Sequence, residues 1–254
     1  MIETELRRQM NVDIHQTNYN GEITPRLLCD IFSDIAQCHT INLGIDVATL
    51  KKQGLTWMLH RMHIIINRMP HLGERVEILT HPAGVNRLFA LRCYRVAVAD
   101  TREELIKANS DWMIIDIERR RPVRPIERLI EINKTLSMPD DMPHNYIENK
   151  HLPADMVETR RFCATFDNID FNGHVTQASY IQMITNSLDF GFLTANNLCE
   201  AEIVYEHEIM PDSTVVAFLK TEDVDGQTVI WHKLMSPDGA VEHCFARTVW
   251  RKKG

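Results

Sequence analysis

The chain has 254 residues, of which 44% are hydrophobic and 25% charged, and its formal net charge is −7. This composition is typical of a soluble globular protein, and the negative charge argues against general nucleic-acid binding. No apolar run approaches the length of a membrane span, and residues 1–5 are too acidic for a signal or transit peptide. Six scattered cysteines without a CxxC pair favour reduced thiols in a cytoplasm over a disulfide framework or a zinc site.

The first half of the chain is predicted to contain one short strand, one long helix and four further strands. Residues 11–17 alternate between polar and apolar side chains as a strand does, and a helix is expected from Pro25 to about residue 42, with proline in its first turn. Strand-like runs follow at 55–67, 74–81, 88–99 and 105–117. Residues 81–84 and 100–102 supply turn residues between these runs.

The second half repeats this order. A strand is expected at 158–166, followed by a helix from Val175 to about residue 195. Further strands are expected near 201–209, 214–222, 227–235 and 241–250, with hairpin signals at 225–226 and 237–239. A long helix followed by an antiparallel meander implies a curved sheet wrapped around the helix. The predicted fold class is therefore α+β, a hotdog arrangement present twice in one chain.

The region between the two halves is interpreted as a linker. Residues 133–157 contain three prolines and show little periodicity. The predicted division is an N-terminal repeat at 1–132, this linker, and a C-terminal repeat at 158–254. Each repeat is then long enough to form a small packed domain.

Two short patterns occur in both halves in the same order. The pattern aromatic-Asn-Gly-x-(Ile/Val)-Thr is found at residues 19–24 and again at 171–176, each time directly before a predicted helix. A second pair of similar sequences follows each helix, at 67–70 and 208–211. Two repeated patterns in one order indicate an internal duplication.

The two copies differ in the residues that could carry out chemistry. The second copy places an acid, an amide and an imidazole at alternate positions, Asp170, Asn172 and His174, and adds Glu208 on the strand expected after the helix. The corresponding residues of the first copy are Asn18, Asn20, Glu22 and Asn67. Unpaired backbone N–H groups and the helix dipole at the start of a helix favour developing negative charge. The second copy is therefore the candidate for a catalytic site.

These residue types suit the hydrolysis of an activated acyl group. That reaction needs a base to deprotonate water and donors for the oxyanion. His174 or a carboxylate could be the base, and Asn172 could be a donor. No G-x-S-x-G sequence occurs, so there is no case for a serine nucleophile elbow. From the residues alone, a purely structural role is equally plausible, in which Asp170 and Asn172 shape a turn and cap the helix.

The sequence around these residues resembles the acyl-acyl-carrier-protein (acyl-ACP) thioesterases. The sequence Asp-x-Asn-x-His-Val ahead of a helix, with residues 205–208 on a later strand, is similar to the C-terminal half of that family. Residues 55–68 are similar to its first core strand, and residues 108–114 and 119–122 to a later strand and its exit. The likeness extends over roughly residues 11–250 in the right order.

The resemblance implies a double-hotdog enzyme that hydrolyses the thioester of fatty acyl-ACP, releases free fatty acid and so terminates fatty-acid synthesis. No organic cofactor and no metal ion is expected. The residues that match the family's catalytic positions are Asp170, Asn172, His174 and Glu208. Plant members carry Asn-Asn after His-Val, where Thr176 and Gln177 stand here, and a cysteine after the glutamate, where Ile209 stands. A cysteine nucleophile therefore has no support, and direct attack by water is expected.

Several alternatives remain open at this stage. The general base could be Asp170, His174 or Glu208, and the activity could be that of an acyl-CoA thioesterase or hydratase of the same fold, or of a non-catalytic acyl-binding protein. The length and branching of the acyl group depend on the depth of the pocket. Two internally paired halves could act as a monomer, and a homodimer is also possible.

Two further groups of residues are candidates for binding. A basic run could steer an acidic carrier protein towards the enzyme despite the net negative charge, although most such runs are only solvated. Its members are Arg119, Arg120, Arg121 and Arg124, with Arg128 beyond them. His60 and His63 could suggest a metal site, but their odd spacing on a strand predicts that they face opposite sides of the sheet.

Overall fold

The computed structural model of the protein describes residues 4–136, 147–148 and 151–254. The first half contains β1 (Leu6–Asn11), η1 (Ile14–Gln16), α1 (Pro25–Leu43), α2 (Val47–Lys51), β2 (Leu55–Ile66), β3 (Arg75–Asn86), β4 (Phe89–Val98), β5 (Glu104–Asp116), β6 (Arg121–Val123) and α3 (Glu127–Leu136). The second half contains β7 (Val157–Cys163), η3 (Phe166–Asn168), α4 (Gln177–Asn186), α5 (Phe190–Ala195), β8 (Asn196–Tyr205), β9 (Thr214–Val224), β10 (Gln227–Met235) and β11 (Glu242–Lys252).

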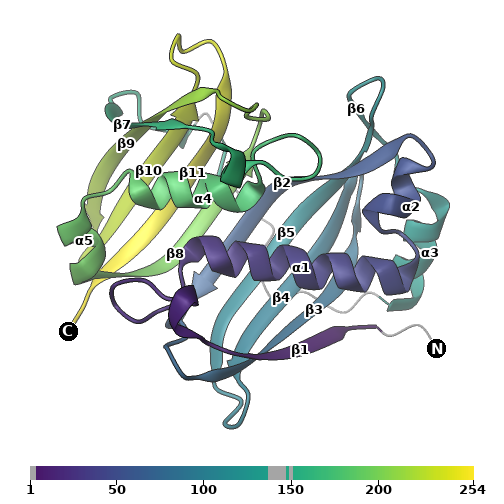
Figure 1. The fold of residues 1–254 in the computed structure, drawn as a ribbon, viewed down its shortest axis with the longest axis horizontal. Coiled ribbons are helices and arrows are strands. Elements are labelled where there is room, and N and C mark those ends of the chain that lie inside the picture. The colour runs from purple at the N-terminus through teal and green to yellow at the C-terminus, as the bar shows by residue number, and fades with distance from the viewer. Residues whose placement is uncertain (1–3, 137–146, 149–150) are drawn as a thin grey trace.

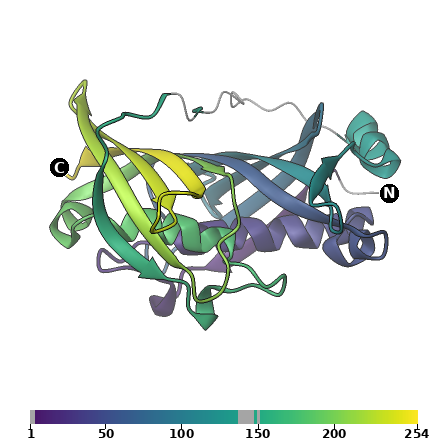
Figure 2. The ribbon, with the colours of Figure 1, turned by 90° about the horizontal axis from the view of Figure 1, so that it is seen from above.

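The strands form one curved antiparallel sheet in which the two halves have the same strand order in mirror image. The order is β1-β3-β4-β5-β2-β8-β11-β10-β9-β7, with the short β6 paired to β5. The halves meet where β2 pairs with β8, from Arg61 opposite Val204 to Ile65 opposite Glu200. Helices α1 and α4 lie beside each other on one face of this sheet (Figure 1), and Figure 2 shows both on the same side of it. The predicted double hotdog is confirmed.

Helix α1 is held in the fold by the apolar stripe that its sequence predicts. Leu28, Phe32 and Ile35 are buried, and the Phe32 ring stacks on Tyr94 of β4 with 4.6 Å between ring centroids. Thr24 caps the helix by accepting a hydrogen bond from the Leu27 N–H at 3.1 Å. The helix thus covers the first half of the sheet. Helix and sheet together enclose a cavity.

The first predicted strand is wrong in position. Strand β1 ends at Asn11, and residues 14–16 form a 3-10 turn instead. The Asp13 N–H donates to the Gln16 side chain at 2.8 Å, and the Gln16 N–H donates back to the Asp13 carbonyl. These local bonds compete with the sheet ladder that the alternation around Val12 suggested.

The turn predicted at residues 81–84 is also wrong. Strand β3 continues through this segment to Asn86, because a bulge between Pro82 and Gly84 absorbs the two turn-forming residues. The chain reverses afterwards, where Arg87 adopts a φ of 56°. The turns predicted at 100–102, 225–226 and 237–239 are confirmed.

Two boundaries and one further helix in the rest of the chain differ from the sequence prediction. The second long helix is interrupted after Asn186, where the Ser187 hydroxyl bonds the Ile184 carbonyl at 2.7 Å, and resumes as α5. Strand β8 ends at Tyr205, so Glu208 lies in the loop beyond it and not on the strand. Helix α3 was not predicted, although its Leu129 and Ile132 are buried with helical spacing.

Residues 137–146 and 149–150 of the predicted linker at 133–157 lie outside the described residues, and residues 133–136 belong to α3. The division into repeats at 1–132 and 158–254 stays a prediction. No helix in the described part of the chain is both long and apolar enough to cross a membrane.

Candidate active site

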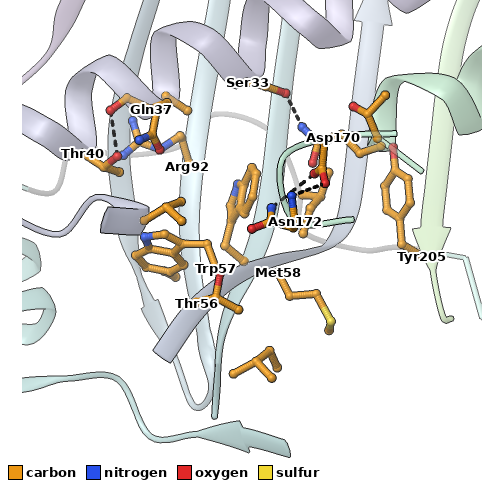
Figure 3. A pocket seen from close by; sticks show the side chains of 18 of the residues that line it. Ser33, Gln37, Thr40, Thr56, Trp57, Met58, Arg92, Asp170, Asn172 and Tyr205 are labelled. Atoms are coloured by element: carbon orange, nitrogen blue, oxygen red, sulfur yellow. Dashed lines mark hydrogen bonds between the residues drawn. The ribbon is translucent and has the colours of Figure 1, made fainter. Parts of the chain in front are cut away.

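A cavity of about 780 Å³ lies between α1 and the sheet and reaches the loops of the second half. Its lining includes all four residues predicted to be catalytic, Asp170, Asn172, His174 and Glu208. Figure 3 shows Asp170 and Asn172 together at one end of this space, with Trp57 and Met58 of β2 beyond them. The structure therefore brings the four predicted residues to one wall of one cavity.

Asp170 and Asn172 are tied together within a tight turn. The Asp170 N–H donates to the His174 carbonyl at 2.9 Å, and the Gly173 N–H donates to the Asp170 carbonyl at 3.0 Å. The Asp170 carboxylate accepts hydrogen bonds from the Asn172 backbone N–H at 2.8 Å and from Asn172 Nδ2 at 3.2 Å. One hydrogen of the Asn172 amide is thereby used, and the other is available to an acceptor in the cavity.

The first half contains the same turn without the same side chains. The Asn18 N–H donates to the Glu22 carbonyl at 2.8 Å, and the Asn18 side chain accepts from the Asn20 N–H at 2.8 Å. Gly21 and Gly173 have φ values of 74° and 86°. The turn is thus a structural device in both copies, and the copies differ in what the turn presents, which is His174 in one and Glu22 in the other.

His174 and Glu208 approach each other across the mouth of the cavity. His174 Nε2 lies 3.4 Å from Glu208 Oε2, and both side chains are partly exposed. When Nε2 carries the proton that faces the carboxylate, Nδ1 is left as the acceptor. Such a pair can orient an imidazole for proton transfer.

Arg120, from the first half, also contacts Glu208. Its Nη2 lies 2.5 Å from the same oxygen, Glu208 Oε2. Arg120 is in the left-handed region with a φ of 51°, in the turn between β5 and β6, and it lines the cavity. Sequence reasoning placed Arg120 in the basic run only. The run was visible in the sequence, but the left-handed backbone and the long-range pairing were not.

The segment that carries Glu208 is fixed by Tyr180 of α4. The Tyr180 hydroxyl donates to the His207 carbonyl at 3.1 Å and accepts from the Ile209 N–H at 3.1 Å. Burial raises the pKa of the Tyr180 phenol, so the group remains a neutral donor. Ile209 is fully buried while Glu208 lines the cavity, which confirms the predicted opposite orientation of these neighbours.

The other predicted docking residues stay on the surface near this site. Arg119, Arg121 and Arg124 are exposed, and Arg119 lies 4.0 Å from Asp116 in the β5–β6 turn. The basic run is therefore divided by its pairing, because Arg120 contacts Glu208 while its side chain stays 73% exposed, and Arg119 lies beside Asp116 instead.

His60 and His63 have separate environments, as their spacing predicts. His60 Nδ1 lies 3.0 Å from the Tyr205 carbonyl oxygen, whereas His63 Nε2 lies 2.9 Å from Glu200 Oε1. His63, Glu200 and Glu202 are a group of described residues whose ligand atoms are close enough to hold a metal ion. Arg247 Nη1 lies 3.3 Å and 3.1 Å from the two carboxylates, so a guanidinium already supplies positive charge there.

Family models match both halves of the chain. The model of the acyl-ACP thioesterase N-terminal domain matches residues 3–133, and that of the C-terminal domain matches residues 153–252. Among curated proteins, a chloroplastic acyl-[acyl-carrier-protein] hydrolase of Cuphea viscosissima is 28% identical over 232 residues, covering 86% of this chain and 54% of that protein. An oleoyl-acyl carrier protein thioesterase of Coriandrum sativum is 25% identical over 93% of this chain and 67% of its own length. The chain thus spans about half the length of the first of these relatives.

Solved structures share the fold over the whole chain. A putative oleoyl thioesterase from Lactobacillus plantarum superposes with a TM-score of 0.88 and 22% identity, covering 98% of this chain and 97% of the other. A 12:0-ACP thioesterase from Umbellularia californica superposes with a TM-score of 0.83 and 16% identity, covering 100% and 96%. At these identities, the similarity supports the arrangement of the two helices and the sheet.

Proposed function

Because the chain belongs to the acyl-ACP thioesterase family, we propose that it hydrolyses the thioester of fatty acyl-ACP and releases the free fatty acid. The observation that carries the proposal is that Asn172, His174 and Glu208 converge on the mouth of a cavity large enough for an acyl chain. The proposed site takes all its residues from one chain and needs no contribution from a second copy.

The proposed reaction is direct attack by water. His174 removes a proton from water as the oxygen bonds to the thioester carbon, and Asn172 Nδ2 donates to the oxyanion that forms. The carbon–sulfur bond then breaks, and the thiolate of the phosphopantetheine arm takes the proton back from His174. Glu208 orients the imidazole and stabilises its charged form, while Asp170 fixes the Asn172 amide.

The proposed partner is the acyl carrier protein, which binds through its acidic surface. Arg119, Arg121 and Arg124 are exposed beside the mouth of the cavity and could attract such a surface over distances near the Debye length. Arg120 is assigned to the active site in this proposal because its guanidinium is paired with Glu208.

The test is fatty-acid release from a panel of acyl-ACP and acyl-CoA substrates by the wild-type protein and His174→Ala. We expect kcat on acyl-ACP to fall by about 10²- to 10⁴-fold, the range for loss of a general base. His71→Ala is the control, since His71 lies 3.9 Å from Glu22, the first-half counterpart of His174, does not line the cavity and should retain activity.

Other outcomes would favour other functions. Equal turnover of acyl-CoA, unaffected by neutralising Arg119, Arg121 and Arg124, would indicate an acyl-CoA thioesterase. Binding of acyl chains without release from either carrier would indicate an acyl-binding protein and would refute the proposed hydrolysis.

A further inference from the structure

The cavity has a polar end that the proposed hydrolysis does not use. Arg92 of β4 lines the cavity beside Gln37 and Thr40 of α1, at the opposite end of the view from Asp170 (Figure 3). Only 7% of the Arg92 residue is exposed, so a guanidinium is enclosed at the place where a fatty acyl chain would be expected to meet apolar groups.

In the part of the chain that the structure describes, this guanidinium is hydrogen-bonded by two side chains, His39 and Thr80. Arg92 Nη1 donates to His39 Nδ1 at 3.2 Å and to Thr80 Oγ1 at 3.1 Å. Thr80 donates its own hydrogen to the Cys93 carbonyl at 2.9 Å, so it acts as an acceptor for Arg92. Both hydrogens of Nη1 are therefore used.

The opposite edge of the guanidinium is open towards the cavity. Nε and Nη2 of Arg92 have no hydrogen-bond partner among the described residues, and neither is among the completely buried polar atoms that lack one. They carry three hydrogens in the planar arrangement that binds both oxygens of a carboxylate. The open edge is thus a preformed site for a planar anion.

Among the described residues, no carboxylate forms an ion pair with Arg92. Asp30 and Asp34 of α1 also line the cavity, but neither is paired with Arg92 in the described structure, and Asp30 lies 3.6 Å from Arg26 instead. Burial lowers the pKa of Arg92, yet arginine stays protonated in proteins. A buried charge is costly unless it is paired, so the missing counter-charge is expected to come from a ligand.

We propose that the Nε–Nη2 edge of Arg92 binds a carboxylate at the far end of the acyl chain, so that the protein selects acyl groups that carry an acidic terminus. The inference rests on the proposed thioester hydrolysis, which sets the other end of the chain at His174. Arg92 on β4 and His174 ahead of α4 both line this one cavity, so a single acyl chain could contact both.

The first experiment compares hydrolysis of three acyl-ACP series of matched length, ending in a methyl group, a carboxylate or the methyl ester of that carboxylate. We expect kcat/KM to be at least about tenfold higher for the carboxylate than for its ester, as a charge-assisted hydrogen bond predicts. In Arg92→Met, which keeps the length of the side chain without its charge, this ratio should fall to about one. Arg95→Met is the control on the same strand, because Arg95 pairs with Glu104, and its ratio should match the wild type.

The second experiment separates this inference from the proposed hydrolysis. Binding of the same acyl-ACPs is measured by fluorescence anisotropy in the His174→Ala protein, with and without Arg92→Met. Tighter binding of the carboxylate series that depends on Arg92 supports the inference even where no acyl-ACP is hydrolysed. Equal kcat/KM values for the carboxylate and the ester would overturn the inference. If all three series were still hydrolysed, the proposed function would stand.

Discussion

The Glu208 carboxylate lies close to two side chains, an imidazole and a guanidinium, that come from different halves of the chain. His174 lies 3.4 Å and Arg120 lies 2.5 Å from the same oxygen, Oε2. A carboxylate that is held by a guanidinium is fixed in position and is already engaged as a hydrogen-bond acceptor. At the residue scale, this favours Glu208 as the group that orients His174 over Glu208 as the base itself.

The two adjacent arginines should therefore behave differently when changed. Arg120→Met is expected to lower kcat by roughly tenfold, because Glu208 loses the partner that fixes it. Arg119→Met should raise KM for acyl-ACP less than about threefold and reduce its dependence on salt, as a surface steering charge does. Steady-state kinetics at two ionic strengths distinguish the effects, and an unchanged kcat in Arg120→Met would contradict the assignment of Arg120 to the active site.

A buried histidine predicts loss of stability in acid. Burial lowers the pKa of His232 to about 3, and its Nε2 lies 2.8 Å from Thr248 Oγ1. The unfolded chain binds a proton near pH 6.5 while the folded protein does not, so the free energy of unfolding should fall as the pH drops from about 6.5 towards 3. The contribution of His232 is about 1.4 kcal/mol per pH unit within that window.

Urea unfolding of the wild type and His232→Asn at several pH values tests this prediction. The variant is expected to be less stable at pH 7, where its packing is poorer, but to lose less stability between pH 6 and pH 4. Parallel pH profiles for the two proteins would mean that another group is responsible for the acid sensitivity.

At the scale of elements, the two related turns allow fold and chemistry to be separated. Gly173 and Gly21 both have positive φ, and a Cβ at either position would meet no atom within 4 Å. Alanine at each position should therefore cost about 1 kcal/mol from backbone strain alone. The strain at residue 173 displaces Asn172 and His174, whereas the strain at residue 21 displaces no group of the proposed site.

We accordingly expect Gly173→Ala to lower kcat by tenfold or more and Gly21→Ala to leave kcat near the wild-type value, with similar decreases in melting temperature for both. Calorimetry and initial-rate assays on the pair provide the measurement. Equal losses of kcat would show that the first turn also supports catalysis.

The sequence predicted most elements correctly because periodicity is a local property. Helix α1 and strands β2, β4 and β5 lie within a few residues of the predicted ranges. The errors arose where a second interaction overrode the local signal, such as the bulge that absorbs Pro82 and Gly84 in β3. Helix α3 was missed because its segment was interpreted as the approach to a linker.

The candidate site was predictable only where its residues are close in sequence. Asp170, Asn172 and His174 share one short motif, and the resemblance added Glu208. Arg120 required knowledge of a contact between halves, and Arg92 required knowledge of an enclosed cavity. A signal for Arg92 did exist, since it alternates with Ala90 and Tyr94 on the buried face of a strand.

At the scale of the whole molecule, the pairing of β2 with β8 joins the halves into one sheet. Without β8, the segment from Arg61 to Ile65 would present unpaired backbone groups along an open edge. A protein consisting of residues 1–136 is therefore expected to self-associate or aggregate. Light scattering would detect this, and a monomer that melts at the temperature of the full chain would contradict the role given to the β2–β8 seam.

The mirrored strand order reflects a duplicated architecture, and this architecture can influence how the preferred acyl chain changes during evolution. After a gene duplication, one copy must keep the catalytic residues. The other copy can then accept substitutions. Here the turn with His174 belongs to the second half, which carries the proposed catalytic residues. Helix α1 and strand β4, which surround the far end of the cavity, belong to the first half. Under the proposed function, lineages could therefore exchange one preferred acyl chain for another through substitutions in α1 and β4 without losing hydrolysis.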